Sequence, residues 1–224
     1  KVPDNAMLSH DLFEGLFARA ALATDIELFE AFPAHYEAAA ARQHRWARGD
    51  WQLLPWLFGR AYTGSEPSRA VVIPGIGRWK ILDNLRRTLV APTAFLTLIV
   101  GWILPEQSAW VWSGFILITI ATPSLFSFVL GLYPRRSGID WRSHFRGTAG
   151  DLILAARQIL LNVTFLVHQA WLMTDAILRT LVRLLFTHRR MLEWVTAAQA
   201  EAAYTSDLTG MYRRMVGAVA LAFM

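Results

Sequence analysis

The sequence predicts a mainly α-helical membrane protein with a short α/β segment at its N-terminal end. Hydrophobic residues make up 54% of the chain and charged residues only 17%, whereas about a quarter of the residues of a soluble domain are charged. Two long segments carry no charge, and others repeat apolar residues at helical spacing. The formal net charge of +5 suits an anionic surface or substrate, but the uncharged runs argue against nucleic acid as a partner.

The chain has no cysteine, which excludes disulfides and cysteine-ligated zinc. The N-terminal stretch has no signal-peptide pattern, and the C-terminal stretch stops inside an apolar run. We therefore expect the chain to be the middle part of a longer polypeptide.

Residues 1–60 form the predicted α/β segment. Met7 and Leu8 would end a strand, and a helix is expected from Asp11 to about Leu22 because its apolar residues share one face. Rough alternation of apolar residues predicts a second strand over 26–32.

A further helix is predicted over 36–58, with a kink or break at Pro55. Glycine and proline then indicate a loop, which continues into the basic and tryptophan-containing stretch "RWKILDNLRR". This stretch is typical of a helix in the bilayer interface. Residues 61–87 are thus expected to be a loop and an interface helix.

Residues 88–133 are predicted to be a transmembrane hairpin. The two uncharged runs, Leu89–Leu104 and Ala109–Tyr133, would be its spans. Arginine pairs flank the hairpin on both sides: Arg86, Arg87, Arg135 and Arg136. Because positive charge favours the cytoplasmic side, residues 1–87 are expected to be cytoplasmic in a multi-pass protein.

Residues 134–210 are predicted to be amphipathic or interfacial helices, and residues 211–224 the start of a further transmembrane helix. Over 151–186 the polar residues gather in one stripe of a long helix. Two arrangements compete for this segment. It can lie on the membrane surface, as one helix or a broken pair, or it can cross the membrane with the stripe facing other helices.

The stretch "LSHDLFEG" places Asp11 at the expected start of a helix. As a helix cap, Asp11 would pair with Glu14, three residues on, in a capping box. As a functional group, its ionised carboxylate at the positive helix end could act as a general base. The neighbouring His10 is a weak candidate for a metal ligand.

The stretch "RQHRW" places Arg42, Arg45 and Trp46 on one side of a helix. Two guanidiniums on one side match a diphosphate, and an indole beside them can stack on a sugar ring. The alternative is a basic, tryptophan-rich helix at the membrane surface. We assign no chemistry to the nearby Arg48 and Trp51, and expect Trp51 and Trp56 to serve packing or membrane contact.

Three features follow one another along the chain: an aspartate that could act as a base, the R-x-x-R-W motif and a membrane hairpin. This order resembles the C-terminal half of processive family-2-like glycosyltransferases. The stretches "LSHDLFEG", "AAARQHRWARGDWQLLPW", "RWKILDNLRR" and "EWVTAAQAE" are closer to one family, the cyclic β-1,2-glucan synthases of the bacterial inner (cytoplasmic) membrane. This resemblance implies that residues 1–60 are the C-terminal part of a GT-A-like α/β glycosyltransferase domain.

The resemblance also implies roles for four residues. Asp11 would deprotonate the acceptor hydroxyl of a growing β-1,2-glucan, Arg42 and Arg45 would bind the diphosphate of UDP-glucose, and Trp46 would stack on the glucan acceptor. The implied enzyme is an inverting, processive glucosyltransferase.

Its Mg²⁺ or Mn²⁺ would be bound by residues outside this chain, because the family's D-x-D motif is absent here. The chain alone is therefore expected to be inactive. Two alternatives stay open. The first is another membrane glucan synthase of the periplasmic-glucan or cellulose type. The second is a non-catalytic membrane scaffold or transport module.

Overall fold

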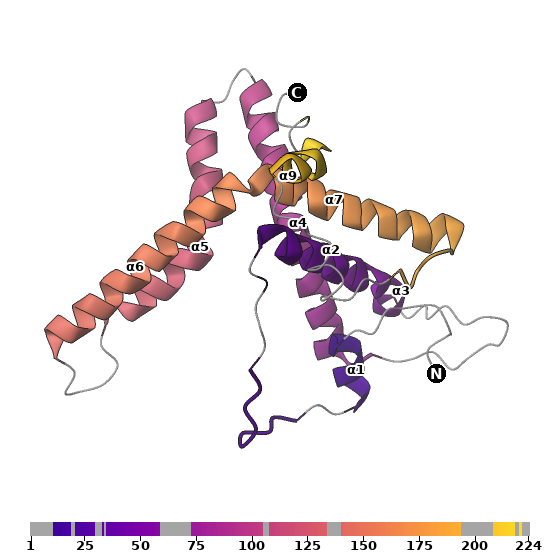
Figure 1. The fold of residues 1–224 in the computed structure, drawn as a ribbon, viewed down its shortest axis with the longest axis horizontal. Helices are drawn as coiled ribbons and strands as arrows, with labels where there is room; N and C mark the ends of the chain where they lie inside the picture. The colour runs from indigo at the N-terminus through magenta and orange to yellow at the C-terminus, as the bar shows by residue number, and fades with distance from the viewer. Residues whose placement is uncertain are drawn as a thin grey trace. The chain divides into compact units, whose positions relative to one another are not determined.

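A computed structural model describes residues 11–18, 21–29, 33, 35–58, 73–104, 108–133, 140–193, 208–217 and 220. The described residues are mainly helical (Figure 1): α1 Asp11–Ala18, α2 Tyr36–Gln52, α3 Leu54–Leu57, α4 Gly75–Ile103, α5 Ala109–Gly131, α6 Trp141–Thr164, α7 Leu166–Val182, the π-helix η1 Arg183–Thr187 and α9 Leu208–Arg214. They divide into two compact units. Unit 1 comprises residues 1–90 and 169–224, and unit 2 comprises residues 91–168.

The apolar core of unit 1 joins α1, α3 and the first turns of α4. Phe13 of α1 packs edge-on against Trp56 of α3, with ring centroids 5.5 Å apart, and Ile81 of α4 completes the contact. Gly77 lies so close to Leu16 that a Cβ at this position would come within 2.8 Å of the Leu16 side chain. Trp56 is only 2% exposed, so the prediction that it serves packing is confirmed.

The strand predicted over 26–32 is wrong where the structure describes it. Residues 26–29 have no strand structure, and the side chains of Leu28 and Phe29 are almost fully exposed. A strand needs a neighbouring strand for its backbone hydrogen bonds, and the described part of the chain contains no strand. The strand ending at Met7 and Leu8 lies outside the described residues. The expected α/β piece is thus seen only as helices.

The helix predicted over 36–58 forms and breaks near the expected place. α2 ends at Gln52, and Leu53 separates it from the short helix α3, which has Pro55 in its first turn. Proline is tolerated there because the first turn has no intrahelical use for its missing N–H. Trp51 Nε1 donates to Thr88 Oγ1 of α4 at 2.9 Å, so this indole also serves packing.

Unit 2 contains the apolar half of α4 together with α5 and α6. Trp112 Nε1 of α5 donates to the carbonyl oxygen of Thr97 at 2.6 Å. A Cβ at Gly101 would overlap the Trp112 indole, so only glycine allows this close approach of α4 and α5. α4 and α5 therefore contact each other, and the interface helix and first span expected before α5 form one continuous helix, α4. The transmembrane hairpin stays a prediction.

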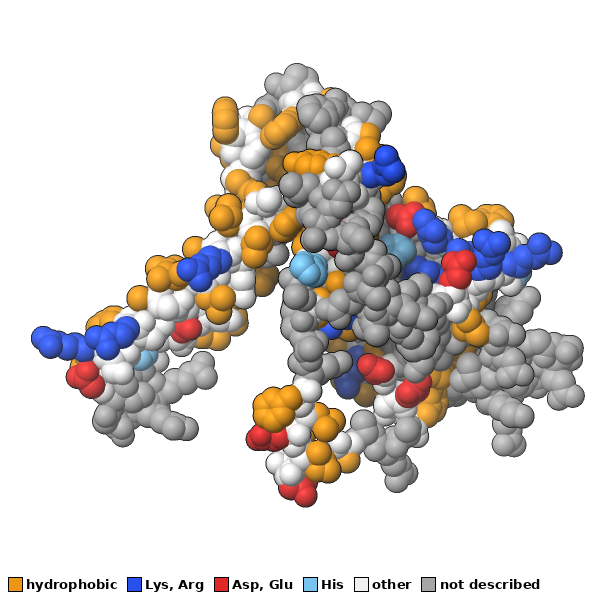
Figure 2. Space-filling view, viewed as in Figure 1, with side chains coloured by type: hydrophobic (Ala, Val, Ile, Leu, Met, Phe, Trp, Pro, Cys, Tyr) orange, Lys and Arg blue, Asp and Glu red, His pale blue; other side chains and the backbone are white. Residues whose placement is uncertain are grey.

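Only one described helix, α5, is by itself long and apolar enough to cross a bilayer. The apolar part of α4 is shorter than the ~20 residues that a span needs, so the predicted first span stays a prediction. Much of the α5 surface is apolar and exposed, with Trp110 88% exposed, and Figure 2 shows hydrophobic side chains over the outer surface of α5 and α6.

The segment predicted as one long amphipathic helix is a broken pair. α6 and α7 meet at Phe165 with a bend of 62°, and together they pass the length and composition test for one broken span. The segment is therefore broken, and whether it lies on the membrane or crosses it stays a prediction. In α7 the polar stripe contacts another helix, because Gln169 Nε2 donates to Tyr36 Oη of α2 at 3.1 Å.

Candidate functional site

Helix α2, which carries the R-x-x-R-W residues, is positioned by α7 in unit 1. Ala47 of α2 packs in a small buried cluster with Met173 and Ala176 of α7. The small alanine side chains allow the two helix backbones to approach closely. At the far end of α2, the amide of Gln52, which is almost fully buried, donates to the carbonyl oxygen of Met191 at 2.8 Å. Apolar and polar contacts therefore both fix α2.

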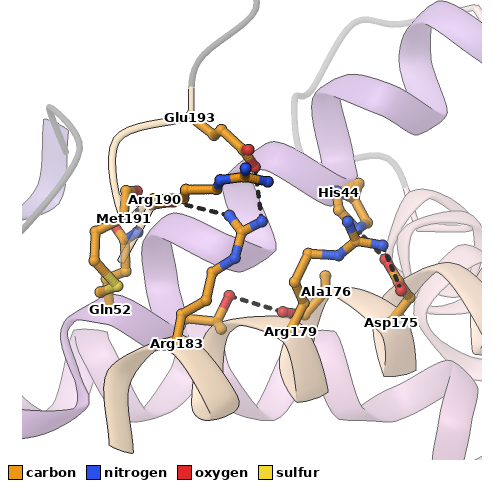
Figure 3. A network of polar contacts seen from close by, with 10 residues as sticks. His44, Gln52, Asp175, Ala176, Arg179, Arg183, Arg190, Met191 and Glu193 are labelled. Atoms are coloured by element: carbon orange, nitrogen blue, oxygen red, sulfur yellow. Dashed lines mark hydrogen bonds and ion pairs between the residues drawn. The ribbon is translucent and has the colours of Figure 1, made fainter. Parts of the chain in front are cut away.

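A polar contact at the centre of the motif joins the same two helices. His44 Nε2 lies 2.8 Å from Asp175 Oδ2, and Arg179 Nη2 donates to the other oxygen of this carboxylate at 2.9 Å (Figure 3). Since an ionised carboxylate only accepts hydrogen bonds, Nε2 of His44 carries the hydrogen. Burial lowers the pKa of His44, and the hydrogen bond to Asp175 partly opposes this. His44 is thus a partly buried residue of the α2–α7 interface, and its burial favours the neutral form.

The predicted ligand-binding residues lie on the other side of α2. At 100° per residue, Arg42 and Trp46 point roughly opposite to His44 and Ala47. The Arg42 guanidinium carbon is 4.8 Å from the centroid of the Trp46 ring, which is cation–π distance, and Trp46 is 55% exposed. α7 therefore covers one face of the helix and leaves an arginine and an indole on the other.

Arg45 lies next to this surface, one turn after Arg42, and is partly buried. A guanidinium offers paired N–H donors to two phosphate oxygens, and an exposed indole can stack on the apolar face of a sugar ring. The structure thus brings Arg42, Arg45 and Trp46 together on α2. This surface can bind a ligand that combines an anionic group with a ring.

Asp11 lies elsewhere in unit 1. It is the first residue of α1, is exposed, and shares the first helical turn with Glu14. α1 packs through Phe13 on Trp56, ten residues beyond Trp46. Among the described residues, no hydrogen bond or ion pair joins Asp11 to the arginines of α2.

Sequence reasoning overlooked two groups near the motif. Asp175, which is distant in the sequence, contacts His44 at the centre of the motif. In the sequence, the only indication of Asp175 was its place in the polar stripe of α7. Arg48 is 8% exposed, and its Nε and Nη2 are buried without a hydrogen-bond partner among the described residues. The sequence predicted no chemistry for Arg48.

Among the described residues, no group of three or more histidine, aspartate or glutamate side chains is placed to hold a metal ion. His10, the weak candidate ligand, lies outside the described residues.

Comparison with known proteins gives a close match over the whole chain. The chain is 42% identical, over 226 aligned residues, to the cyclic beta-(1,2)-glucan synthase NdvB of Rhizobium meliloti (strain 1021). The alignment covers 100% of this chain and 8% of that protein. No family model matches the chain. The resemblance predicted from "LSHDLFEG" and "RQHRW" is confirmed: the chain is similar to one segment of a cyclic β-1,2-glucan synthase.

Proposed function

We propose that this chain is the acceptor-side part of the glucosyltransferase site of a membrane-bound cyclic β-1,2-glucan synthase. The complete enzyme would transfer glucose from UDP-glucose to a growing β-1,2-glucan, with inversion at C1 and without release between steps. The main observation is the α2 surface, where Arg42 lies against exposed Trp46 and partly buried Arg45 lies beside them. The whole-chain identity to a glucan synthase supports this proposal.

Each residue has a chemical task in this reaction. Negative charge develops on the departing UDP, and Arg42 and Arg45 would stabilise it through hydrogen bonds to the diphosphate. Trp46 would hold the terminal acceptor glucose by stacking, and Asp11 would take the proton of its hydroxyl. Mg²⁺ or Mn²⁺ would be held by residues outside this chain and would supply further positive charge at the diphosphate.

Helix α5 supports placement of the enzyme in a membrane. Its exposed apolar surface would face lipid, and with the flanking arginines it would leave residues 1–87 on the cytoplasmic side of the bacterial inner membrane. UDP-glucose is a cytoplasmic donor in this proposal, so the α2 surface and the donor would lie on the same side.

The test uses the full-length synthase in nanodiscs, with UDP affinity measured by calorimetry. Arg45→Ala is expected to weaken UDP binding by about tenfold or more, because a hydrogen bond to a charged group contributes ~1.5–3 kcal/mol. Exposed Arg142 of α6 provides the matched control as Arg142→Ala. Unchanged UDP affinity in Arg45→Ala would reject the assignment, and linkage analysis of the product would separate β-1,2 synthesis from a periplasmic-glucan or cellulose type of activity.

A further inference from the structure

Arg48, two residues after the R-x-x-R-W motif, has an unused pair of hydrogen-bond donors in a buried position. Its side chain is 8% exposed, and neither Nε nor Nη2 has a hydrogen-bond partner in the part of the chain that the structure describes. These two atoms lie on the same edge of the guanidinium, and their N–H bonds are parallel. A buried charged group without a partner strongly destabilises the folded state. An acceptor with two oxygens would pair with both donors of this edge.

The surroundings of Arg48 are formed by α2, α7 and the chain that follows α7. The charges of Arg179, Arg183, Asp175 and Glu193 all lie close enough to influence its guanidinium. Burial lowers the pKa of Arg48, and the positive charge of Arg183 lowers it further. Charged side chains from three segments of unit 1 therefore lie around Arg48.

The carboxylates of this cluster already have other partners. Asp175 accepts hydrogen bonds from Arg179 and His44, and Glu193 pairs with Arg183 at 2.8 Å (Figure 3). His44 also contacts this cluster, and burial lowers its pKa. Arg190 influences Glu193 as well, so guanidiniums outnumber the two carboxylates of this cluster among the described residues.

Two residues in the chain after α7 adopt an uncommon backbone conformation beside this cluster. His188, directly after the π-helix η1, is left-handed with φ 49°, and Arg190 is left-handed with φ 54°. Non-glycine residues seldom adopt this conformation, and it persists where the surroundings hold it. Here Arg183 Nη1 donates to the carbonyl oxygen of Arg190 at 2.8 Å. The turn thereby holds Arg183 and Glu193 near Arg48.

We propose that Arg48 is the centre of a phosphate-binding site between α2 and the α7–η1 turn, separate from the α2 surface of Arg42 and Trp46. The unused edge of Arg48 would bind two oxygens of one phosphate group. The remaining phosphate oxygens would face the neighbouring guanidiniums, which distinguishes a phosphate from a carboxylate with its two oxygens. A phosphodiester, such as a lipid headgroup, and free phosphate both offer this chemistry.

The experiment measures the Tm of the full-length synthase, purified in detergent without lipid. Inorganic phosphate and, separately, dihexanoyl-phosphatidylglycerol are titrated, with sodium acetate at equal ionic strength as the control. A ligand of the folded state raises Tm with concentration. We expect a saturable rise with phosphate, with the lipid or with both, and none with acetate. A rise with the lipid alone assigns the site to a headgroup, and a rise with phosphate alone assigns it to a soluble anion.

Variants link this effect to Arg48. Arg48→Met is expected to abolish the rise, and Arg48→Lys to weaken the apparent affinity about tenfold, because lysine keeps the charge but lacks the two parallel donors. The matched control is Arg78→Ala, an exposed arginine of α4.

Three results would overturn the proposal. The first is no rise in Tm with either phosphate compound in the wild type, and the second is a rise that persists in Arg48→Met. The third is a higher Tm of Arg48→Met than of the wild type at every ligand concentration, because without a bound anion the substitution only removes an unpaired buried charge. Tm does not depend on glucose transfer, so failure here is separate from failure of the proposed function.

Discussion

The two units of this chain use similar helices in opposite ways. In unit 1, α2 and α7 turn polar groups toward each other, as in the pair of His44 with Asp175. In unit 2, α5 turns apolar groups outward, and Trp110 is 88% exposed. A helix interface with paired polar groups holds a site in place, whereas an apolar outer surface suits lipid. Unit 1 therefore holds the paired polar groups, and unit 2 holds the exposed apolar surface.

The largest expected effect is on catalysis in unit 1. Asp11→Asn in the full-length enzyme is expected to lower glucose incorporation ~100-fold or more, because general-base catalysis contributes ~10²–10⁴-fold. Asparagine caps a helix about as well as aspartate, so a loss of rate would not come from a lost cap. Near-normal turnover, measured with radiolabelled UDP-glucose, would contradict the assignment of Asp11 as the base.

A pair of tryptophans provides a direct stability test of the comparison. Trp56→Ala, in the core of unit 1, is expected to cost ~3–5 kcal/mol in the free energy of unfolding. Trp110→Ala, on the outer surface of α5, is expected to change it by less than ~0.5 kcal/mol in detergent. Denaturant unfolding measures both. Equal losses would show that the outer surface of α5 is packed against protein.

The apolar surface of α5 can be tested by adding a charge. Ile118→Asp, near the middle of this helix, is expected to cost ~2.5–3.5 kcal/mol in membrane insertion. Trp110→Asp, near the helix end, is expected to cost less, because the penalty falls toward the interface. A glycosylation-mapping assay of the full-length chain measures insertion. Equal insertion of wild type and Ile118→Asp would contradict a spanning α5.

The smallest expected effect concerns pH and the α2–α7 interface. Because burial lowers the folded-state pKa of His44, its stabilising contribution is complete above the unfolded value of ~6.5 and is lost as pH falls through the folded value. Asp175, Arg48 and Arg179 are the charged groups that face this histidine. Thermal midpoints of wild type and His44→Gln from pH 5 to 8 check this. A parallel decline of both proteins would exclude His44 as the source.

Local patterns predicted much of the fold. Apolar spacing located α1, an uncharged apolar run located α5, and Pro55 located the break between α2 and α3. The strand expected over 26–32 failed because alternation over a few residues does not supply a partner strand.

The binding surface was only partly predictable. Arg42, Arg45 and Trp46 share one side of α2 because helical spacing requires it. Asp175 reaches His44 from 131 positions away, and Arg48 is notable only because it is buried without an acceptor. Both features depend on how α7 packs on α2. Local sequence patterns do not determine this packing.

A structure of the full-length synthase with UDP bound tests the central claim most directly. The claim is that the side of α2 opposite to α7 binds the sugar nucleotide. We expect the guanidinium of Arg45 within ~3 Å of a diphosphate oxygen, the usual distance for such a pair, and Trp46 beside the glucan acceptor. A diphosphate bound away from α2, with Arg42 and Trp46 in contact with lipid alone, would contradict it.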